Sequence, residues 1–206
     1  MTPADDYQKI TDRLFYWSAY DSKLKAELSS SAFVEGGNMF LVDPIPLARE
    51  ALEEMTSFQN VKAVFLTSET HGRAALFYRK HFGCPIWAHP SAQPALLAEG
   101  ITLDDTYEDH DIVLNACEAI HVPGTKPGET VLFLPSETGV MFVGDALINL
   151  GNTGFSFLPD RYSDNPRQSR ESLVKLLDYR FERMFFAHGE PLLQGAGDRL
   201  EAMLLD

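Results

Sequence analysis

The stretch Phe65-Leu66-Thr67-Ser68-Glu69-Thr70-His71-Gly72-Arg73 marks a sharp change of local structure. It begins in a short apolar run, residues 61–66, whose length and polar flanks are typical of a buried strand. Apolar residues then recur at helical spacing through residues 71–82, and Gly83 stands where a helix commonly ends. The polar residues of the stretch are therefore expected on a loop between the end of a strand and the start of a helix.

Strand and helix patterns alternate on both sides of this stretch. Strand-like segments, rich in aromatic and β-branched residues or bounded by Pro and Gly, are residues 14–20, 31–42, 85–88, 112–122, 129–134, 140–143 and 183–187. Helical spacing occurs in residues 47–55, 167–179 and 197–204. Each half of the chain thus supplies a sheet with helices. Two such halves packed sheet to sheet predict an α/β (α+β) fold, a four-layer αββα sandwich, as a single domain over residues 1–206.

Two shorter segments complete this pattern. Glu35-Gly36-Gly37-Asn38 interrupts residues 31–42 and predicts a hairpin turn between two strands. Residues 149–165 are rich in Gly, Pro and Asn and are expected to form a long loop. That loop is either functional or a disordered flap, and the sequence leaves both open.

The composition excludes several classes of function. The chain has 17 Lys and Arg against 30 Asp and Glu, a formal net charge of -13, and no visible basic cluster, so nucleic acid and anionic membranes are not expected partners. No apolar run approaches the roughly 18 to 20 residues that cross a bilayer. Cys84 and Cys117 form neither a CxxC pair nor a disulfide framework, and the first residues do not have the pattern of a secretion signal. We therefore expect an acidic cytoplasmic protein.

Five punctuated segments, each at the end of a predicted strand, carry a family resemblance. They are Leu41-Val42-Asp43, the stretch quoted above, Val122-Pro123-Gly124-Thr125-Lys126-Pro127-Gly128, Phe142-Val143-Gly144-Asp145 and Phe185-Phe186-Ala187-His188-Gly189-Glu190. Each alone is a weak signal. In this order and with these elements between them, they resemble the metallo-β-lactamase superfamily over nearly the whole chain.

The resemblance implies a metal site from which most ligands have been lost. In the family, a His-x-His-x-Asp-His loop, a later His, an Asp and a final His hold one or two Zn²⁺ or similar ions that activate water. The ligand positions that carry other residues here are Ser68, Thr70, Gly72, Arg73 and Thr125. Asp145 and His188 remain as ligands, and Asp43 remains as the Asp that steadies the loop. Because a catalytic zinc ion ordinarily has three protein ligands, no metal or other cofactor is expected.

Two functions follow, from different classes. The first is a catalytically silent protein that binds a small molecule or a protein partner in a cleft containing Ser68, Thr70, Arg73 and Thr125. The alternative is a hydrolase whose zinc or other divalent metal is held by His71, Asp145 and His188, with Glu69 as a possible addition. Whether the protein is an enzyme is left open by the sequence, as are its substrate and a possible homo-oligomer.

Individual residues also have plainer interpretations. Arg73 either replaces the missing cation beside Asp145 or reaches solvent from the first turn of a helix. His188 could cap a turn, His71 could be an ordinary helix residue, and Asp43 before Pro44 could be turn chemistry. Ser68 near His71 is the one nearby nucleophile and base pair, without independent support. The remaining histidines considered, expected at the surface or in caps, are His81, His89 and His110.

Overall fold

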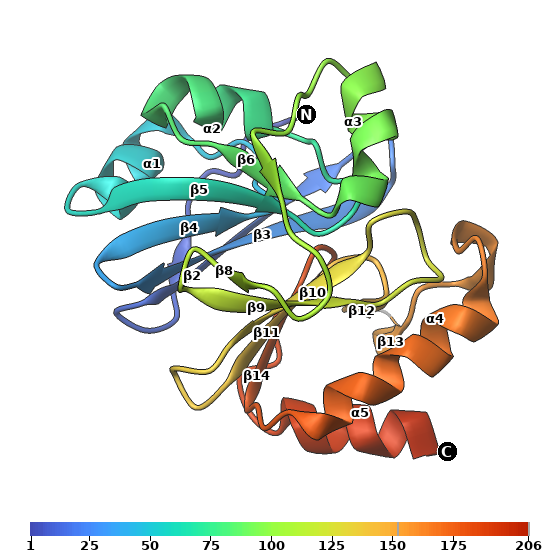
Figure 1. Ribbon diagram of the computed structural model, residues 1–206. Coiled ribbons are helices and arrows are strands. Elements are labelled where there is room, and N and C mark those ends of the chain that lie inside the picture. The colour runs from blue at the N-terminus through green and yellow to red at the C-terminus, as the bar shows by residue number, and fades with distance from the viewer. Residues whose placement is uncertain (152, 206) are drawn as a thin grey trace.

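Two β-sheets lie face to face in the protein, as a computed structural model of the chain shows (Figure 1). The structure describes residues 1–151 and 153–205; Asn152, within the predicted loop 149–165, and Asp206 lie outside the described residues. The first sheet has the strand order β1-β2-β3-β4-β5-β6-β7. Its strands are β1 (Gln8–Lys9), β2 (Leu14–Asp21), β3 (Ala26–Glu35), β4 (Asn38–Val42), β5 (Asn60–Leu66), β6 (Ile86–Ala88) and β7 (Asp105–Thr106).

The second sheet is built from the C-terminal half of the chain and has the order β14-β11-β10-β9-β8. Its strands are β8 (Ile112–Val113), β9 (Cys117–His121), β10 (Thr130–Leu134), β11 (Val140–Val143) and β14 (Arg183–Phe186). A separate hairpin is formed by β12 (Leu147–Leu150) and β13 (Gly154–Phe157).

Helices cover the outer face of each sheet, which gives four layers (Figure 1). The first sheet carries α1 (Arg49–Thr56), α2 (Ala75–Phe82) and α3 (Gln93–Ala98), and the second carries α4 (Pro166–Leu173) and α5 (Ala196–Leu205). Short 3-10 turns are η1 (Pro90–Ala92), η2 (Asp160–Tyr162) and η3 (Val174–Asp178). The predicted αββα sandwich is confirmed.

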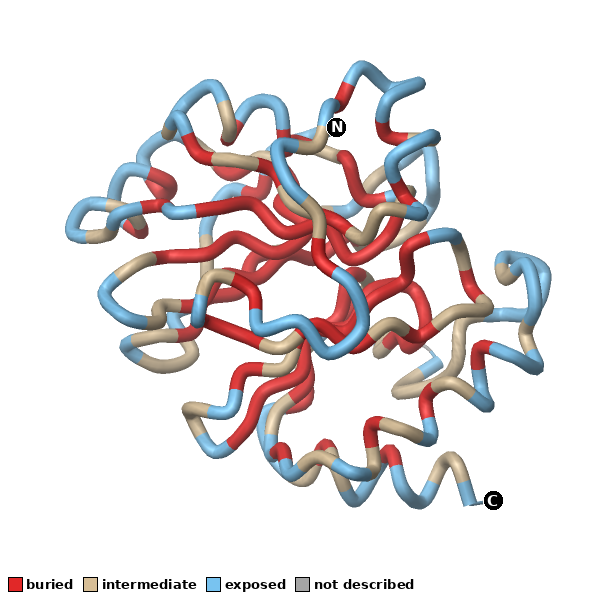
Figure 2. Tube along the Cα trace, in the orientation of Figure 1, coloured by how far each residue is buried: buried red, intermediate tan, exposed pale blue. Residues whose placement is uncertain are grey.

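Three apolar clusters fill the three interfaces between these layers. One packs the first sheet against its helices, around Leu41, Val64 and Tyr78, and another packs the second sheet against α4 and α5. The cluster between the sheets includes stacked rings, among them Phe33 and Phe142 with centroids 5.1 Å apart. The buried residues accordingly concentrate along the strands in Figure 2. This central layer is the main apolar contact that holds the two halves together.

Two pairs of parallel strands, one pair in each sheet, have their C-terminal ends at the same edge of the sandwich. In the first sheet β4 and β5 run parallel, and in the second β11 and β14 run parallel. The segments that follow these strands begin at Asp43, Thr67, Gly144 and Ala187. Open α/β sheets commonly place their functional groups beyond such strand ends. The resemblance-bearing segments are thus neighbours in space, although they span most of the chain.

Several element boundaries differ from the sequence prediction. His71 lies before α2, which begins at Ala75, because residues 68–74 form turns and irregular loop instead of the first turn of the helix. Residues 112–122 form two strands, β8 and β9, that pair with each other in a hairpin. Within the described part of the predicted loop 149–165, the β12–β13 hairpin and η2 are ordered structure. Helix α3 was not predicted. None of the helices in the described residues is long and apolar enough to cross a membrane.

Candidate metal centre

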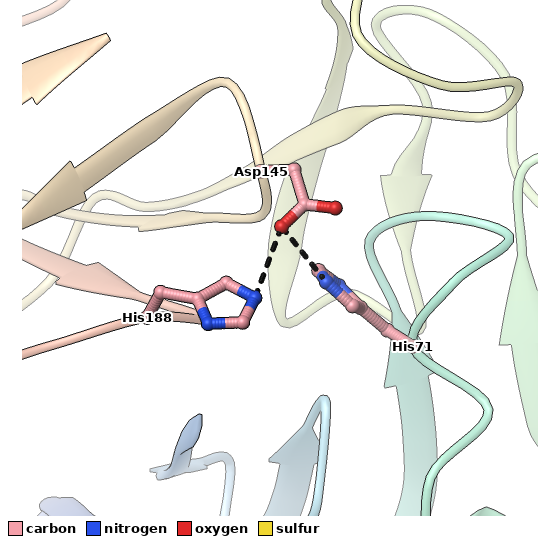
Figure 3. A group of neighbouring side chains, drawn as sticks. All are labelled: His71, Asp145 and His188. Atoms are coloured by element: carbon pink, nitrogen blue, oxygen red, sulfur yellow. Dashed lines mark ion pairs between the residues drawn. The ribbon is translucent and has the colours of Figure 1, made fainter. Parts of the chain in front are cut away.

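Three side chains converge on one point at this edge of the sandwich: His71, Asp145 and His188 (Figure 3). His71 comes from the loop after β5, Asp145 from the segment after β11, and His188 from the segment after β14. Asp145 Oδ1 lies 3.3 Å from His71 Nε2 and 3.2 Å from His188 Nε2. These three ligand atoms all lie within 4.8 Å of one another. The two sheets therefore both contribute to the cluster.

The ring of His71 is oriented by Asp43. His71 Nδ1 lies 3.1 Å from Asp43 Oδ2 and 3.0 Å from Thr67 Oγ1. The Thr67 hydroxyl donates a hydrogen bond to Asp43 Oδ2 at 2.5 Å, and the Thr67 backbone N–H donates to Asp43 Oδ1 at 2.8 Å. A carboxylate can only accept, so His71 Nδ1 is the protonated nitrogen and Nε2 faces the cluster. Asp43 adopts φ 48°, an uncommon value outside glycine.

The ring of His188 is oriented in the same way by a different group. Its Nδ1 lies 3.0 Å from the backbone carbonyl oxygen of Glu27, which again can only accept. The neighbouring backbone is anchored on β3, because Ser29 N–H donates to the Ala187 carbonyl and Gly189 N–H donates to Ser29 Oγ. His188 Nε2 is thereby directed at Asp145.

Both imidazoles consequently direct Nε2 at one carboxylate oxygen, a contact that is favourable only if a proton or a metal ion lies between the nitrogen and the oxygen. His71 Nε2 is buried and has no hydrogen-bond partner among the described residues. In the metal-free protein, burial alone would lower the pKa of His71, but the charges of Asp43 and Asp145 outweigh it and raise that pKa to about 10. Burial alone would raise the pKa of Asp145, yet His71 and His188 hold it well below its ordinary range. The cluster thus demands positive charge, supplied either by protons or by a metal ion.

The donor set fits a zinc-like ion. Zinc takes imidazole nitrogen and carboxylate oxygen at roughly 2.0 to 2.2 Å, so neighbouring ligands of a tetrahedral ion are roughly 3.3 to 3.6 Å apart. The two separations from Asp145 Oδ1, 3.3 Å and 3.2 Å, are close to that range. Metal-binding histidines also usually donate their other N–H to a carboxylate or a backbone carbonyl, as His71 and His188 do. Thr70 Oγ1 donates to Asp145 Oδ2 at 3.1 Å, which leaves Oδ1 for the imidazoles.

Arg73 does not occupy the predicted place. Its guanidinium donates to three backbone carbonyls: Nη1 to Ser29 at 2.6 Å and to Asp43 at 3.1 Å, and Nη2 to Ala187 at 3.0 Å. Within residues 1–151 and 153–205, the ion-pair partners of Asp145 are His71 and His188, and no hydrogen bond joins Arg73 to Asp145. The predicted direct contact between the two is therefore absent. His71, two positions earlier in the sequence, lies beside Asp145 instead.

The other predicted residues lie around the cluster with unequal involvement. Ser68 is buried, and its Oγ lies 3.3 Å from Thr70 Oγ1. Thr125 is buried, and its Oγ1 has no partner in the described structure. Glu69 is outside the group of ligand atoms, but its backbone N–H donates to Pro127 and brings the loops together.

Glu129 is a buried carboxyl group that sequence reasoning did not single out. Its Oε1 accepts the backbone N–H of Ala146 at 2.9 Å, and its Oε2 has no partner among the described residues. Burial, followed by the charge of Asp145, raises the pKa of Glu129 to about 8. Gly144 makes room for it, since a Cβ there would lie 2.6 Å from Glu129 Oε1 and 2.5 Å from Thr67 Oγ1. A lone Glu after a Pro-Gly loop gave no sequence signal of burial.

The cavities described in the protein do not form the predicted cleft. One of about 330 Å³ is lined by residues such as Tyr179, Phe181 and Glu201 and shares no residue with the cluster. A second, of about 10 Å³, lies between the sheets beside Ser29, Asp43 and Ala187. It has room for roughly one water molecule.

Comparisons with known proteins agree with the architecture. The family model of the metallo-beta-lactamase superfamily matches residues 9–197. The chain is similar to the solved structures of VMB-1 (14% identity, TM-score 0.76, covering 100% of this chain and 98% of that chain) and DIM-1 exposed to ceftazidime (13%, 0.77, 100% and 98%). It is also similar to FIM-1 from Pseudomonas aeruginosa in its mono-zinc form (14%, 0.74, 98% and 95%). No curated protein sequence matches the chain.

These structural similarities, at low identity, show a shared fold and nothing about substrate. The family match spans nearly the whole chain, including every segment that reaches the three-residue cluster. The chain therefore belongs to the metallo-β-lactamase superfamily.

Proposed function

We propose that the protein is a hydrolase with a single divalent metal site made of His71, Asp145 and His188. The observation that carries this proposal is the convergence of two oriented imidazole nitrogens on one carboxylate oxygen. Three protein ligands are the usual number at a catalytic zinc ion, and they leave a position open for water or substrate. The set differs from the family pattern, because His71 stands one position away from the family's ligand.

A divalent ion held there would supply Lewis acidity and activate water near neutral pH. The residues of this chain would orient the three ligands toward that ion. Asp43 keeps His71 in the tautomer that presents Nε2, and the Glu27 carbonyl does the same for His188. Thr70 holds one oxygen of Asp145, so that the carboxylate offers the other oxygen to the ion. The burial of His71 and Asp145 keeps bulk water from competing with these contacts.

A catalytically silent binding protein remains the competing proposal. It is supported by the five replaced ligand positions. In that case a proton on His71 would balance Asp145, and the same geometry would persist without metal. The two proposals therefore differ in metal affinity rather than in fold.

Metal binding distinguishes them. Protein stripped with chelator should take up one equivalent of Zn²⁺ or Mn²⁺, measured by competition with a chromogenic chelator and by mass spectrometry. His188→Gln should abolish this uptake, whereas His81→Gln, a change at an exposed histidine on α2, should not. Loaded protein should then hydrolyse at least one member of a panel of lactam, thioester and phosphodiester substrates, and lose that rate in Asp145→Asn. If the wild-type protein takes up no metal, the hydrolase proposal is wrong and the catalytically silent binding protein is the remaining hypothesis.

A further inference from the structure

The ligands of the candidate centre belong to different sheets, so their spacing depends on how the sheets are docked at this edge. His71 follows β5 of the first sheet, while Asp145 and His188 follow β11 and β14 of the second. The ring centroids of His71 and His188 are 6.1 Å apart. A displacement of about 1 Å between the sheets would exceed the roughly 0.5 Å tolerance of a preorganised site.

Arg73 spans this junction. Its guanidinium contacts the carbonyls of Ser29 on β3, of Asp43 just after β4, and of Ala187 just after β14. Asp43 orients His71, and Ala187 directly precedes His188. The Arg73 side chain thus connects Asp43, which orients His71, to Ala187, which precedes His188.

The backbone of Arg73 adopts an uncommon conformation. Its φ is 35°, outside the usual region for a residue with a side chain, which costs free energy that surrounding contacts must offset. The planar fork of a guanidinium can reach three carbonyls at once, and an ammonium group cannot reproduce that spread. Three carbonyl oxygens also compensate a half-buried cation that has no direct carboxylate partner within the described residues.

We propose that Arg73 is a positioning residue for the metal centre, holding the His71 and His188 segments at the separation that a shared ion requires. This inference rests on the proposed function. It makes a prediction opposite to that of simple electrostatics. Removing a positive charge near a divalent cation should strengthen metal binding, whereas removing a positioning contact should weaken it, typically 10- to 100-fold for a group that orients ligands.

The test compares zinc affinity in Arg73→Met, Arg73→Lys and a matched control, Arg13→Met. Arg13 is also half-buried and donates to a β3 carbonyl, that of Val34 at 2.8 Å, but it lies toward the opposite end of that strand. We expect Arg73→Met to bind zinc at least 10-fold more weakly, Arg73→Lys to be weakened although it keeps the charge, and Arg13→Met to match wild type. Unchanged or tighter binding by Arg73→Met would overturn the inference, even if the variant is less stable.

A second measurement needs no metal. In ¹⁵N-histidine-labelled, chelator-treated wild-type protein, the imidazole spectra should show His188 protonated at Nδ1 and protected from exchange by its bond to Glu27. In Arg73→Met this signal should broaden or shift to averaged tautomers, and in Arg13→Met it should not. If Arg73→Met does not fold, Arg73→Lys carries the same comparison. If the wild-type protein takes up no zinc, the proposed function is wrong. The spectra alone then test the positioning role of Arg73, and identical His188 signals in wild type and Arg73→Met would contradict that role.

Discussion

Replacing Asp43 by Asn should destabilise the metal-free protein strongly, although the two side chains have nearly the same shape. Asp43 is 2% exposed and accepts three hydrogen bonds, from Thr67 N, Thr67 Oγ1 and His71 Nδ1. An amide can keep the first of these, but its NH₂ group would then face the other two donors. Each hydrogen bond to a charged group contributes about 1.5 to 3 kcal/mol, and breaking a buried charge pair costs about 3 to 5 kcal/mol in total. We take about 3 to 5 kcal/mol as the expected loss.

For a chain of this size, 1 kcal/mol corresponds to a change of roughly 2 to 4 °C in the unfolding midpoint, so Asp43→Asn should lower it by at least about 6 °C. Scanning calorimetry at pH 7 with chelator present measures this directly. Asp12→Asn, a change at an exposed carboxylate paired with Lys9, should leave the midpoint where it is. A drop for Asp43→Asn no larger than that of the control would refute the claim that the carboxylate is ionised and holds His71.

Three further outcomes are expected. Gly144→Ala should be clearly destabilised in thermal melts, since its Cβ would meet Thr67 Oγ1 at 2.5 Å, whereas Gly151→Ala, with nothing within 4 Å, should melt like wild type. Burial, together with the neighbouring His121, lowers the pKa of His89 to about 4. Between about pH 6.5 and pH 4 the unfolded chain therefore binds a proton at His89 that the folded chain does not bind. The free energy of unfolding should fall as the pH drops through that range. His89→Phe, which can keep the stack on His121 at a 4.0 Å centroid distance, should make urea unfolding less sensitive to pH in that range; an unchanged slope would contradict this. Asp145→Asn should lose zinc uptake while keeping the wild-type far-ultraviolet circular dichroism spectrum, and retained uptake would show that the ligand set is wrong.

The architecture could be predicted because its signals are local and repeated. Short apolar strands, Gly and Pro punctuation and helical spacing recur through both halves, and the family match agrees with the sandwich they imply. The site was harder to predict, because one-residue shifts on an irregular loop decide which side chain points inward. Counting positions placed Arg73 beside Asp145, whereas the loop turns His71 there instead. The backbone carbonyls that hold Arg73 and His188 carry no sequence signal, since every residue has one.

The hydrogen bonds that orient His71 and His188 come entirely from the protein itself, through a carboxylate, a hydroxyl and backbone carbonyls. Such a site is preorganised, so little of an ion's binding energy is needed to order loops. Chelation should then leave the fold intact, unlike in small zinc domains whose folding is itself metal binding. The same independence gives the lineage freedom to change. A scaffold that keeps its shape without its ion can lose or relocate ligands one at a time, while each intermediate sequence still yields a folded protein on which selection can act.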